Sequence, residues 1–306
     1  MTPLSEYLDA RRAEIDAALA AALPTAPECP APLADAMKYS VTAGGKRLRP
    51  ILCLASCEAV GGDRANALPA ACAIELIHTY SLIHDDLPAM DNDTMRRGQP
   101  TLHVVAGEGT AILAGDGLLT DAFALLAREP RGLDQGLIDR KLRVIGIIAT
   151  AAGPMGMVGG QAIDLACVTP AADGGQPQPL DADGLRLMHA RKTGALIRAA
   201  AMAGAVMGGG RDSAIEAVDK AAAEFGLAFQ IVDDILDVEG ASQDLGKTAG
   251  KDAAAGKPTY PALYGLDVSR QMARECLERA EAALRAANLH DTRLIDIGAW
   301  IVERTN

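Results

Sequence analysis

The feature that most limits the fold of this chain is the near absence of strand-forming sequence. Alternating runs of Val, Ile, Thr and aromatic residues are missing from its 306 residues, whereas Ala, Leu, Glu, Arg and Met dominate segment after segment. These are residues that favour helices. The sequence therefore predicts an all-α fold. Helices are expected at residues 3–22, 31–44, 48–60, 64–86, 107–127, 135–151, 155–167, 181–208, 212–238, 269–287 and 291–303.

Composition narrows the class of protein. Hydrophobic residues make up 49% of the chain, which is enough to bury a large core and excludes intrinsic disorder. A net charge of −11 with 3% aromatic residues argues against nucleic-acid binding. No repeat and no separating linker is visible, so we expect a single domain over residues 1–306. The segment 197–208 is apolar nearly all round, which either a central layer of buried helices or a large dimer interface would explain.

The cysteines and the apolar segments indicate a cytoplasmic protein. None of the six cysteines forms a CxxC pair, and all lie in apolar or Ala-rich segments, as expected of buried thiols in a reducing compartment. Residues 1–19 carry charges at helical spacing and show no secretory signal. Apolar runs elsewhere are shorter than the roughly 20 residues of a membrane span. We therefore expect no membrane span.

Two groups of aspartates follow apolar helical runs and point to a cation. In the second group, Asp233 and Asp237 are four residues apart, so on an α-helix they face the same way and repel unless a cation lies between them. In the first group, Pro88 must distort or end the turn after Asp85, which can bring Asp91 back beside it. Carboxylate oxygens without Cys or many His nearby favour Mg²⁺ or Mn²⁺ over Zn²⁺.

The ordinary explanation for such a group is a solvated helix end. Apolar residues directly precede both groups, and acidic residues at a helix C-terminus oppose the helix dipole. Both features argue against a purely solvated role.

Basic residues accompany the aspartates and suggest a site for a polyphosphate. The loop 44–50 reads GGKRLRP, and Arg96 and Arg97 follow the first aspartate group. Each of these cations alone is also compatible with a solvated surface charge. A P-loop at 240–248 is excluded, because five residues rather than four separate its glycines and a helix precedes it.

Six motifs together resemble the trans-isoprenyl diphosphate synthases, with bacterial farnesyl diphosphate synthases as the closest match. They occur in the family's order over residues 44–261. The motifs are GGKRLRP (44–50), HTYSLIHDDLPAMDNDTMRRG (78–98), GGQAIDL (159–165), RKTG (191–194), FQIVDDILD (229–237) and GKTAGKDAAAGKPTYP (246–261). The resemblance implies an isoprenoid-synthase helical bundle around a large central active-site cavity, and a homodimer. Asn92 departs from the usual bacterial pattern, which has Asp.

The resemblance also implies roles for individual residues. In this family, two aspartate-rich motifs hold three Mg²⁺ ions, for which Mn²⁺ is an alternative. The metal ligands match Asp85, Asp91 and Asp233. The positions that support these ligands match Asp86, Asp234 and Asp237. The isopentenyl diphosphate site matches Lys46, Arg49, His78 and Arg97. The positions around the allylic diphosphate and the reaction centre match Arg96, Lys192, Thr193, Gln230, Lys247 and Lys257.

The implied reaction is a 1′-4 condensation that needs no protein nucleophile. The allylic diphosphate ionises, C4 of isopentenyl diphosphate attacks C1 of the cation, and a proton is lost from C2. Closure of the segment 240–258 would exclude water.

Product length is expected to depend on the residues below the first motif. Tyr80 lies five residues before Asp85, or about 7.5 Å deeper along a helix, with the smaller Ser81 beside it. An aromatic residue here resembles the farnesyl-producing class, so we expect dimethylallyl diphosphate to be extended through geranyl diphosphate to the C15 product. The alternatives are a geranyl or geranylgeranyl diphosphate synthase, a terpene cyclase, against which the GGKRLRP loop argues, and a non-catalytic subunit, against which both complete motifs argue.

Overall fold

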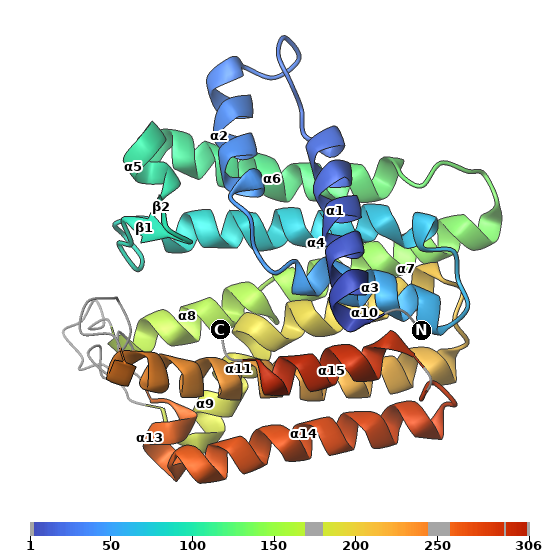
Figure 1. Cartoon of the computed structure of the whole chain (residues 1–306). Helices are drawn as coiled ribbons and strands as arrows, with labels where there is room; N and C mark the ends of the chain where they lie inside the picture. Colours follow the sequence, from blue (N-terminus) through green and yellow to red (C-terminus); the bar gives the residue numbers. More distant parts are fainter. Residues whose placement is uncertain (1–2, 169–179, 244–257, 291, 305–306) are drawn as a thin grey trace. The chain divides into compact units, whose positions relative to one another are not determined.

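The computed structural model describes residues 3–168, 180–243, 258–290 and 292–304, and these residues are helical almost throughout (Figure 1). The all-α prediction is confirmed. The chain forms two compact units, one of Met1–Ile148 with Ala203–Gly210 and the other of Ala149–Met202 with Arg211–Asn306. We call them unit 1 and unit 2. The single domain over residues 1–306 stays a prediction.

Unit 1 is built on a long buried helix that ends at the first aspartate group. This helix, α4, packs against α3 and α6, and its Ile74, Leu76 and Ile77 are fully buried (Figure 1). A two-stranded antiparallel hairpin, β1 and β2, follows it. The elements of unit 1 are α1 (Leu4–Ala22), α2 (Ala31–Thr42), α3 (Leu48–Ala59), α4 (Arg64–Asp85), β1 (Met95–Arg96), β2 (Gln99–Pro100), α5 (Leu102–Ala106), α6 (Glu108–Arg128) and most of α7 (Gln135–Ala152).

The end of α10 belongs to unit 1 because it packs closely on α3. A Cβ atom built on Gly204 would lie 1.8 Å from the carbonyl oxygen of Cys53, so only glycine allows this approach. Cys53 and Cys57 lie on the same face of α3, and both are buried and free. The expectation of buried thiols is confirmed for these two residues and for Cys29, Cys72 and Cys276, but Cys167 is only half-buried.

Unit 2 is centred on α11, which lies beside α14 and α15 (Figure 1). The apolar residues Phe225, Ile231 and Ile235 of α11 are buried. The elements of unit 2 are α8 (Met157–Val168), α9 (Ala182–His189), the π-helical turn η1 (Ala190–Gly194), the first part of α10 (Ala195–Met207), α11 (Asp212–Gln243), α13 (Tyr260–Tyr264), α14 (Leu266–Ala286) and α15 (Arg293–Glu303).

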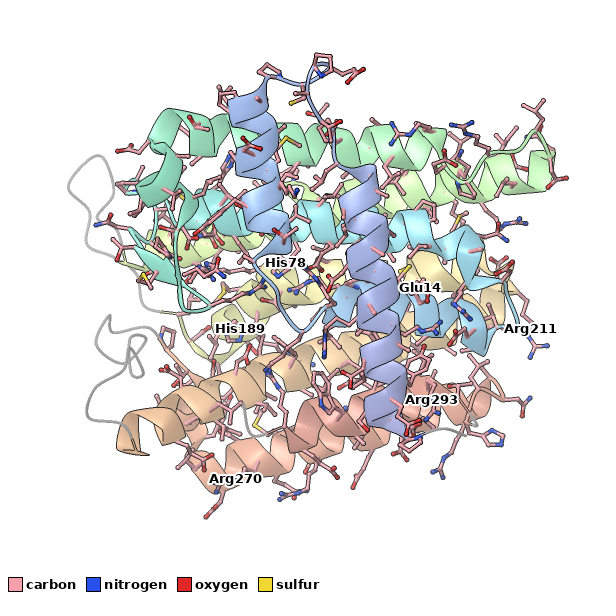
Figure 2. All side chains as sticks on the ribbon, turned by 45° about the horizontal axis from the view of Figure 1, so that its top comes forward. Glu14, His78, His189, Arg211, Arg270 and Arg293 are labelled. Carbon is pink, nitrogen blue, oxygen red and sulfur yellow. The ribbon has the colours of Figure 1, made fainter. Side chains whose placement is uncertain are left out.

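The second aspartate group is not at a helix end, and this corrects the sequence analysis. Helix α11 continues to Gln243 instead of ending at residue 238. The extension has a partner on α14, because Arg270 forms an ion pair with Glu239 (Figure 2). The opposition between the helix dipole and terminal carboxylates therefore applies to the first group only. Helices α5 and α13 and the hairpin were not predicted.

Two stretches, Glu108–Arg128 and Gln135–Cys167, are long and apolar enough to span a membrane by length and composition alone. Core helices of proteins without membrane segments meet the same criterion. The absence of a membrane span stays a prediction.

Candidate active site

The backbone brings the two predicted metal ligands of the first motif together. Helix α4 ends at Asp85, and the chain turns so that the Asp91 N–H donates a 2.9 Å hydrogen bond to the Asp85 carbonyl. Asn92 has a positive φ of 52°, a conformation that Asn tolerates better than most residues. The expected return of Asp91 beside Asp85 is confirmed for the backbone. Asp85 is half-buried and Asp91 is exposed.

Asp86 is held by Arg96 of the hairpin. The Arg96 Nε donates to both carboxylate oxygens of Asp86 at 2.8 and 3.0 Å, and its Nη2 lies 2.7 Å from Oδ1. Burial raises the pKa of Asp86, although the bonds from Arg96 act in the opposite direction. This pair fixes the hairpin to the end of α4. Arg96 was expected near the allylic diphosphate, and that role stays a prediction.

Two of the residues expected to bind isopentenyl diphosphate, Arg49 and Arg97, lie close enough to His78 of α4 to act on it electrostatically; Figure 2 labels His78. Burial lowers the pKa of His78 well below its ordinary 6.5, and the charges of Arg49 and Arg97 lower it further. His78 is therefore neutral at pH 7. Arg97 donates a hydrogen bond to the Gly44 carbonyl, which brings the hairpin beside the loop that carries Lys46. The result is a cluster of basic side chains suited to binding a diphosphate.

Arg47, in the same loop, has a structural role. Its side chain is 2% exposed and forms a 2.7 Å ion pair with Glu75, whose side chain is 3% exposed. It also donates to Asp16 at 2.8 Å and to the Val41 carbonyl at 2.6 Å. Arg47 therefore anchors the GGKRLRP loop to α1, α2 and α4.

Tyr80, the expected chain-length residue, is buried on α4. Its ring meets the His84 ring edge-on with centroids 5.7 Å apart, and the His84 Nε2 lies 3.1 Å from the Ile112 carbonyl of α6. Tyr80 therefore lies on the side of α4 that packs toward α6. Ser81 is half-buried, and its hydroxyl donates to the His78 carbonyl.

The second motif lies on α11, and both of its first two aspartates are held by residues distant in sequence. Asp234 is buried and accepts a 2.9 Å hydrogen bond from the backbone N–H of Tyr260. Asp233 accepts a 2.5 Å hydrogen bond from Arg304, which also donates to the Phe229 carbonyl and lies 4.0 Å above the Phe229 ring. Asp237 is half-buried one turn further along the helix.

Lys192 and Thr193 occupy the π-helical turn η1, a type of distortion frequent at functional sites. The Lys192 Nζ lies 2.5 Å from the buried carboxylate of Asp164 on α8. A Cβ atom on Gly160 would lie 2.1 Å from the Lys192 backbone nitrogen, so this glycine lets α8 approach the turn. Gln230 is half-buried on α11. Lys247 and Lys257 lie outside the described residues.

Two functional candidates, Asp164 and Arg304, were missed by the sequence analysis. Asp164 lies inside the GGQAIDL motif, which the family resemblance marked without assigning its carboxylate. Arg304 lies 71 residues from Asp233, and no local pattern signals the pairing.

The donor chemistry of the aspartates fits a hard divalent cation. Asp85 and Asp91 are joined by one turn of the backbone in unit 1, and Asp233 and Asp237 share one face of α11 in unit 2. Carboxylate oxygens are the ligands that Mg²⁺ prefers. Within the parts of the chain that the structure describes, no group of three or more Asp, Glu, His or Cys side chains forms a metal cage.

Known proteins are similar to this chain over nearly its whole length. The polyprenyl synthetase family model matches residues 30–290. A protein named chloroplastic geranylfarnesyl diphosphate synthase from Leucosceptrum canum is 48% identical over 91% of this chain and 74% of its own length. A dimethylallyltranstransferase from Fischerella ambigua is 45% identical over 99% of this chain and 84% of its own. The crystal structure of an FPP/GFPP synthase from Zymomonas mobilis superposes with a TM-score of 0.83, at 38% identity and 98% coverage of both chains.

Proposed function

The chain belongs to the polyprenyl synthetase family and is a prenyltransferase of the trans-isoprenyl diphosphate synthase type, and from this premise we propose that it is a farnesyl diphosphate synthase. It would condense isopentenyl diphosphate with dimethylallyl diphosphate and then with geranyl diphosphate to give (2E,6E)-farnesyl diphosphate. The observation that supports the reaction type is that the chain carries a basic cluster at His78 as well as two aspartate motifs.

The basic cluster supports binding of isopentenyl diphosphate. Arg49 and Arg97 act on His78 from two different segments, so an anion placed there meets several donors at once. Neutral His78 can donate one ring N–H without adding charge. Lys46, in the GGKRLRP loop (44–50), adds a further cation.

The aspartate motifs support binding of the allylic diphosphate through Mg²⁺. Asp85, Asp91 and Asp233 would hold the ions, which when bound neutralise the charge of the departing diphosphate. Lys192 lies in the π-helical turn with its Nζ 2.5 Å from Asp164, and it would supply an additional cation. Asp86 and Asp234 support the motifs by binding Arg96 and the Tyr260 backbone. Mn²⁺ in place of Mg²⁺ is the alternative.

The proposed C15 product length rests on Tyr80. Its ring is 7% exposed and lies on α4, five residues before Asp85, where it would limit the depth available to a growing chain. The name of the Zymomonas mobilis structure includes farnesyl diphosphate, which supports this length. That name and the Leucosceptrum canum relative also include geranylfarnesyl diphosphate, so a longer product is the second candidate.

Replacing Tyr80 with alanine is expected to make C20 and longer alcohols the main dephosphorylated products, because the ring no longer closes the cavity. The measurement is gas chromatography of phosphatase-treated products from geranyl diphosphate and isopentenyl diphosphate with Mg²⁺. Tyr80→Phe is the matched control, since it keeps the ring and should keep the C15 product. A wild-type enzyme that makes mainly geranylgeraniol, or an unchanged C15 product from Tyr80→Ala, would remove Tyr80 from this role.

A homodimer is proposed from the exposed apolar side chains of α5 and α6. Val104, Val105, Ile112 and Leu113 are between 43% and 58% exposed. Within the most apolar 18-residue stretch of α6, only 39% is buried. Aliphatic side chains this exposed on adjacent helices mark an interaction surface. The cytoplasmic location also stays a proposal.

Leu113→Asp is expected to raise the dimer dissociation constant at least about tenfold, because a carboxylate would be buried at the contact. Sedimentation velocity over a dilution series measures this. Val268→Asp is the matched control, since Val268 is 50% exposed on α14 in the other unit. Equal dissociation constants for the two variants would place the dimer contact elsewhere.

A further inference from the structure

His84 directly precedes Asp85 on α4, and the proposed reaction gives it no role. It lies one helical turn after Tyr80, so the two side chains point to the same side of α4. Their rings meet edge to face, with centroids 5.7 Å apart and planes at 79° to each other, an arrangement that aromatic pairs prefer. The His84 ring therefore fills the space beside the Tyr80 ring.

The His84 ring is also held by α6, which packs against α4 (Figure 1). Its Nε2 lies 3.1 Å from the Ile112 carbonyl oxygen and 4.0 Å from the Asp116 Oδ1. Because a carbonyl oxygen only accepts, Nε2 carries the proton and donates this hydrogen bond. The backbone of α6 thus fixes the ring, independently of the side chain of residue 112.

Gly115 provides the space on α6 that the His84 ring occupies. A Cβ atom built on this glycine would lie 2.2 Å from the His84 Nε2 and 2.6 Å from its Cδ2, far closer than atoms can approach. Glycine in a helix interior is unfavourable for the helix. Here its missing side chain is replaced by the imidazole of another helix. At Gly109 of the same helix, by contrast, a Cβ atom would meet nothing within 4 Å.

Tyr80 depends on His84 for its position because the two rings differ in exposure. The Tyr80 residue is 7% exposed, whereas the His84 side chain is 29% exposed. Protein interiors are close-packed, and a buried side chain relaxes toward any space that opens beside it. Loss or displacement of the His84 ring would open such space on the side of α6, and the Tyr80 ring would move into it.

We propose that His84 is a positioning residue for product length. Held by the Ile112 carbonyl and accommodated by Gly115, its ring keeps the Tyr80 ring where that ring limits the growing chain. The inference rests on the proposed role of Tyr80 and deepens it. Product length then depends on the contact between α4 and α6 as well as on the size of residue 80.

The first test is His84→Ala, which removes the ring that supports Tyr80. The ratio of C20 to C15 alcohols is expected to rise about tenfold. It is measured by gas chromatography of phosphatase-treated products from geranyl diphosphate and isopentenyl diphosphate with Mg²⁺, at matched conversion. A ratio of products does not depend on how much of the protein is active, so a general loss of folding or turnover would not imitate this result. An unchanged ratio would overturn the proposal.

The second test, Gly115→Ala, displaces the same ring without changing it. Because Tyr80 is enclosed, the imidazole is expected to move toward its exposed side, away from Tyr80. The C20 to C15 ratio should therefore rise as in His84→Ala. Gly109→Ala is the matched control, since it makes the same substitution on the same helix in open space, and it should keep the wild-type ratio. Equal ratios in the two glycine variants would contradict the placement of His84 by α6.

A double substitution shows whether His84 acts through Tyr80. Adding His84→Ala to Tyr80→Ala should leave the product ratio nearly as it is in Tyr80→Ala alone, because no ring remains to be positioned. Effects that multiply would mean that His84 itself lines the cavity, and would overturn the positioning role.

Failure of this inference is distinguishable from failure of the proposed function. If Tyr80→Ala lengthens the product but the His84 and Gly115 variants do not, the positioning role alone is contradicted. If Tyr80→Ala keeps the C15 product, or if the wild-type protein forms no prenyl product, the proposed function is contradicted and this inference with it.

Discussion

Replacing Asp85 with alanine is expected to slow turnover on the order of 10³-fold while the protein stays folded. Asp85 and Asp91 lie at the two ends of one backbone turn. Loss of either carboxylate would make the proposed Mg²⁺ site incomplete. The fold should be unaffected, because the Asp91 N–H donates to the backbone carbonyl of residue 85 and not to its side chain. Alanine keeps that hydrogen bond and the helix end.

Three measurements separate the metal role from a structural one. Turnover with geranyl and isopentenyl diphosphates gives the rate, Mn²⁺ titration followed by electron paramagnetic resonance gives metal affinity, and circular dichroism gives the helix content. Asp35→Ala is the control, since Asp35 is an exposed carboxylate of α2 in the same unit. Asp233→Ala should behave like Asp85→Ala. Near-normal turnover and Mn²⁺ affinity in both variants would contradict the assignment of Asp85 and Asp233 as metal ligands.

Arg47→Met is expected to lower the free energy of unfolding by about 3–5 kcal/mol. The substitution leaves the Glu75 carboxylate, at 3% side-chain exposure, without its 2.7 Å partner. It also removes the hydrogen bonds to Asp16 and to the Val41 carbonyl. An unpaired buried charge costs more than the original pair contributes.

Urea denaturation followed by circular dichroism measures this loss, and a second substitution identifies its cause. Adding Glu75→Gln to Arg47→Met should recover part of the stability, because the unpaired charge is then gone. Arg131→Met is the surface control, since its side chain is 83% exposed, and it should change stability by no more than about 0.5 kcal/mol. A loss in Arg47→Met as small as in this control would show that the buried pair is not a main support of unit 1.

Helix positions were predictable because they depend on local composition and on the Gly and Pro residues that end helices. The ends of α4 and α1 were predicted to within a residue, and Pro88 correctly signalled the turn that brings Asp91 back to Asp85. The prediction for the end of α11 was wrong because the apolar pattern stops at Val238, and Gly240 follows it. Tertiary support from Arg270 carries the helix on to Gln243.

Side-chain roles were predictable only where the family resemblance assigned them to a residue. The basic residues around His78 came from two quoted motifs, and the structure gathers Arg49 and Arg97 there. The pairs of Arg304 with Asp233 and of Asp164 with Lys192 were not predicted, because Arg304 lies in no quoted motif and the resemblance gave Asp164 no role. Such pairs depend on how helices pack, which local spacing does not encode.

The π-helical turn at Ala190–Gly194 has a consequence for the length of the chain between α9 and α10. A π-helical turn contains one residue more than the α-helical path it replaces. Deleting one residue there would restore a regular helix and keep α9 and α10 nearly in their present register, because the α-helical path needs one residue fewer. The backbone of the turn itself would change, and with it the position from which Lys192 reaches Asp164. One surplus residue thus fixes the local path of the chain at Lys192 while the helices on either side stay in phase.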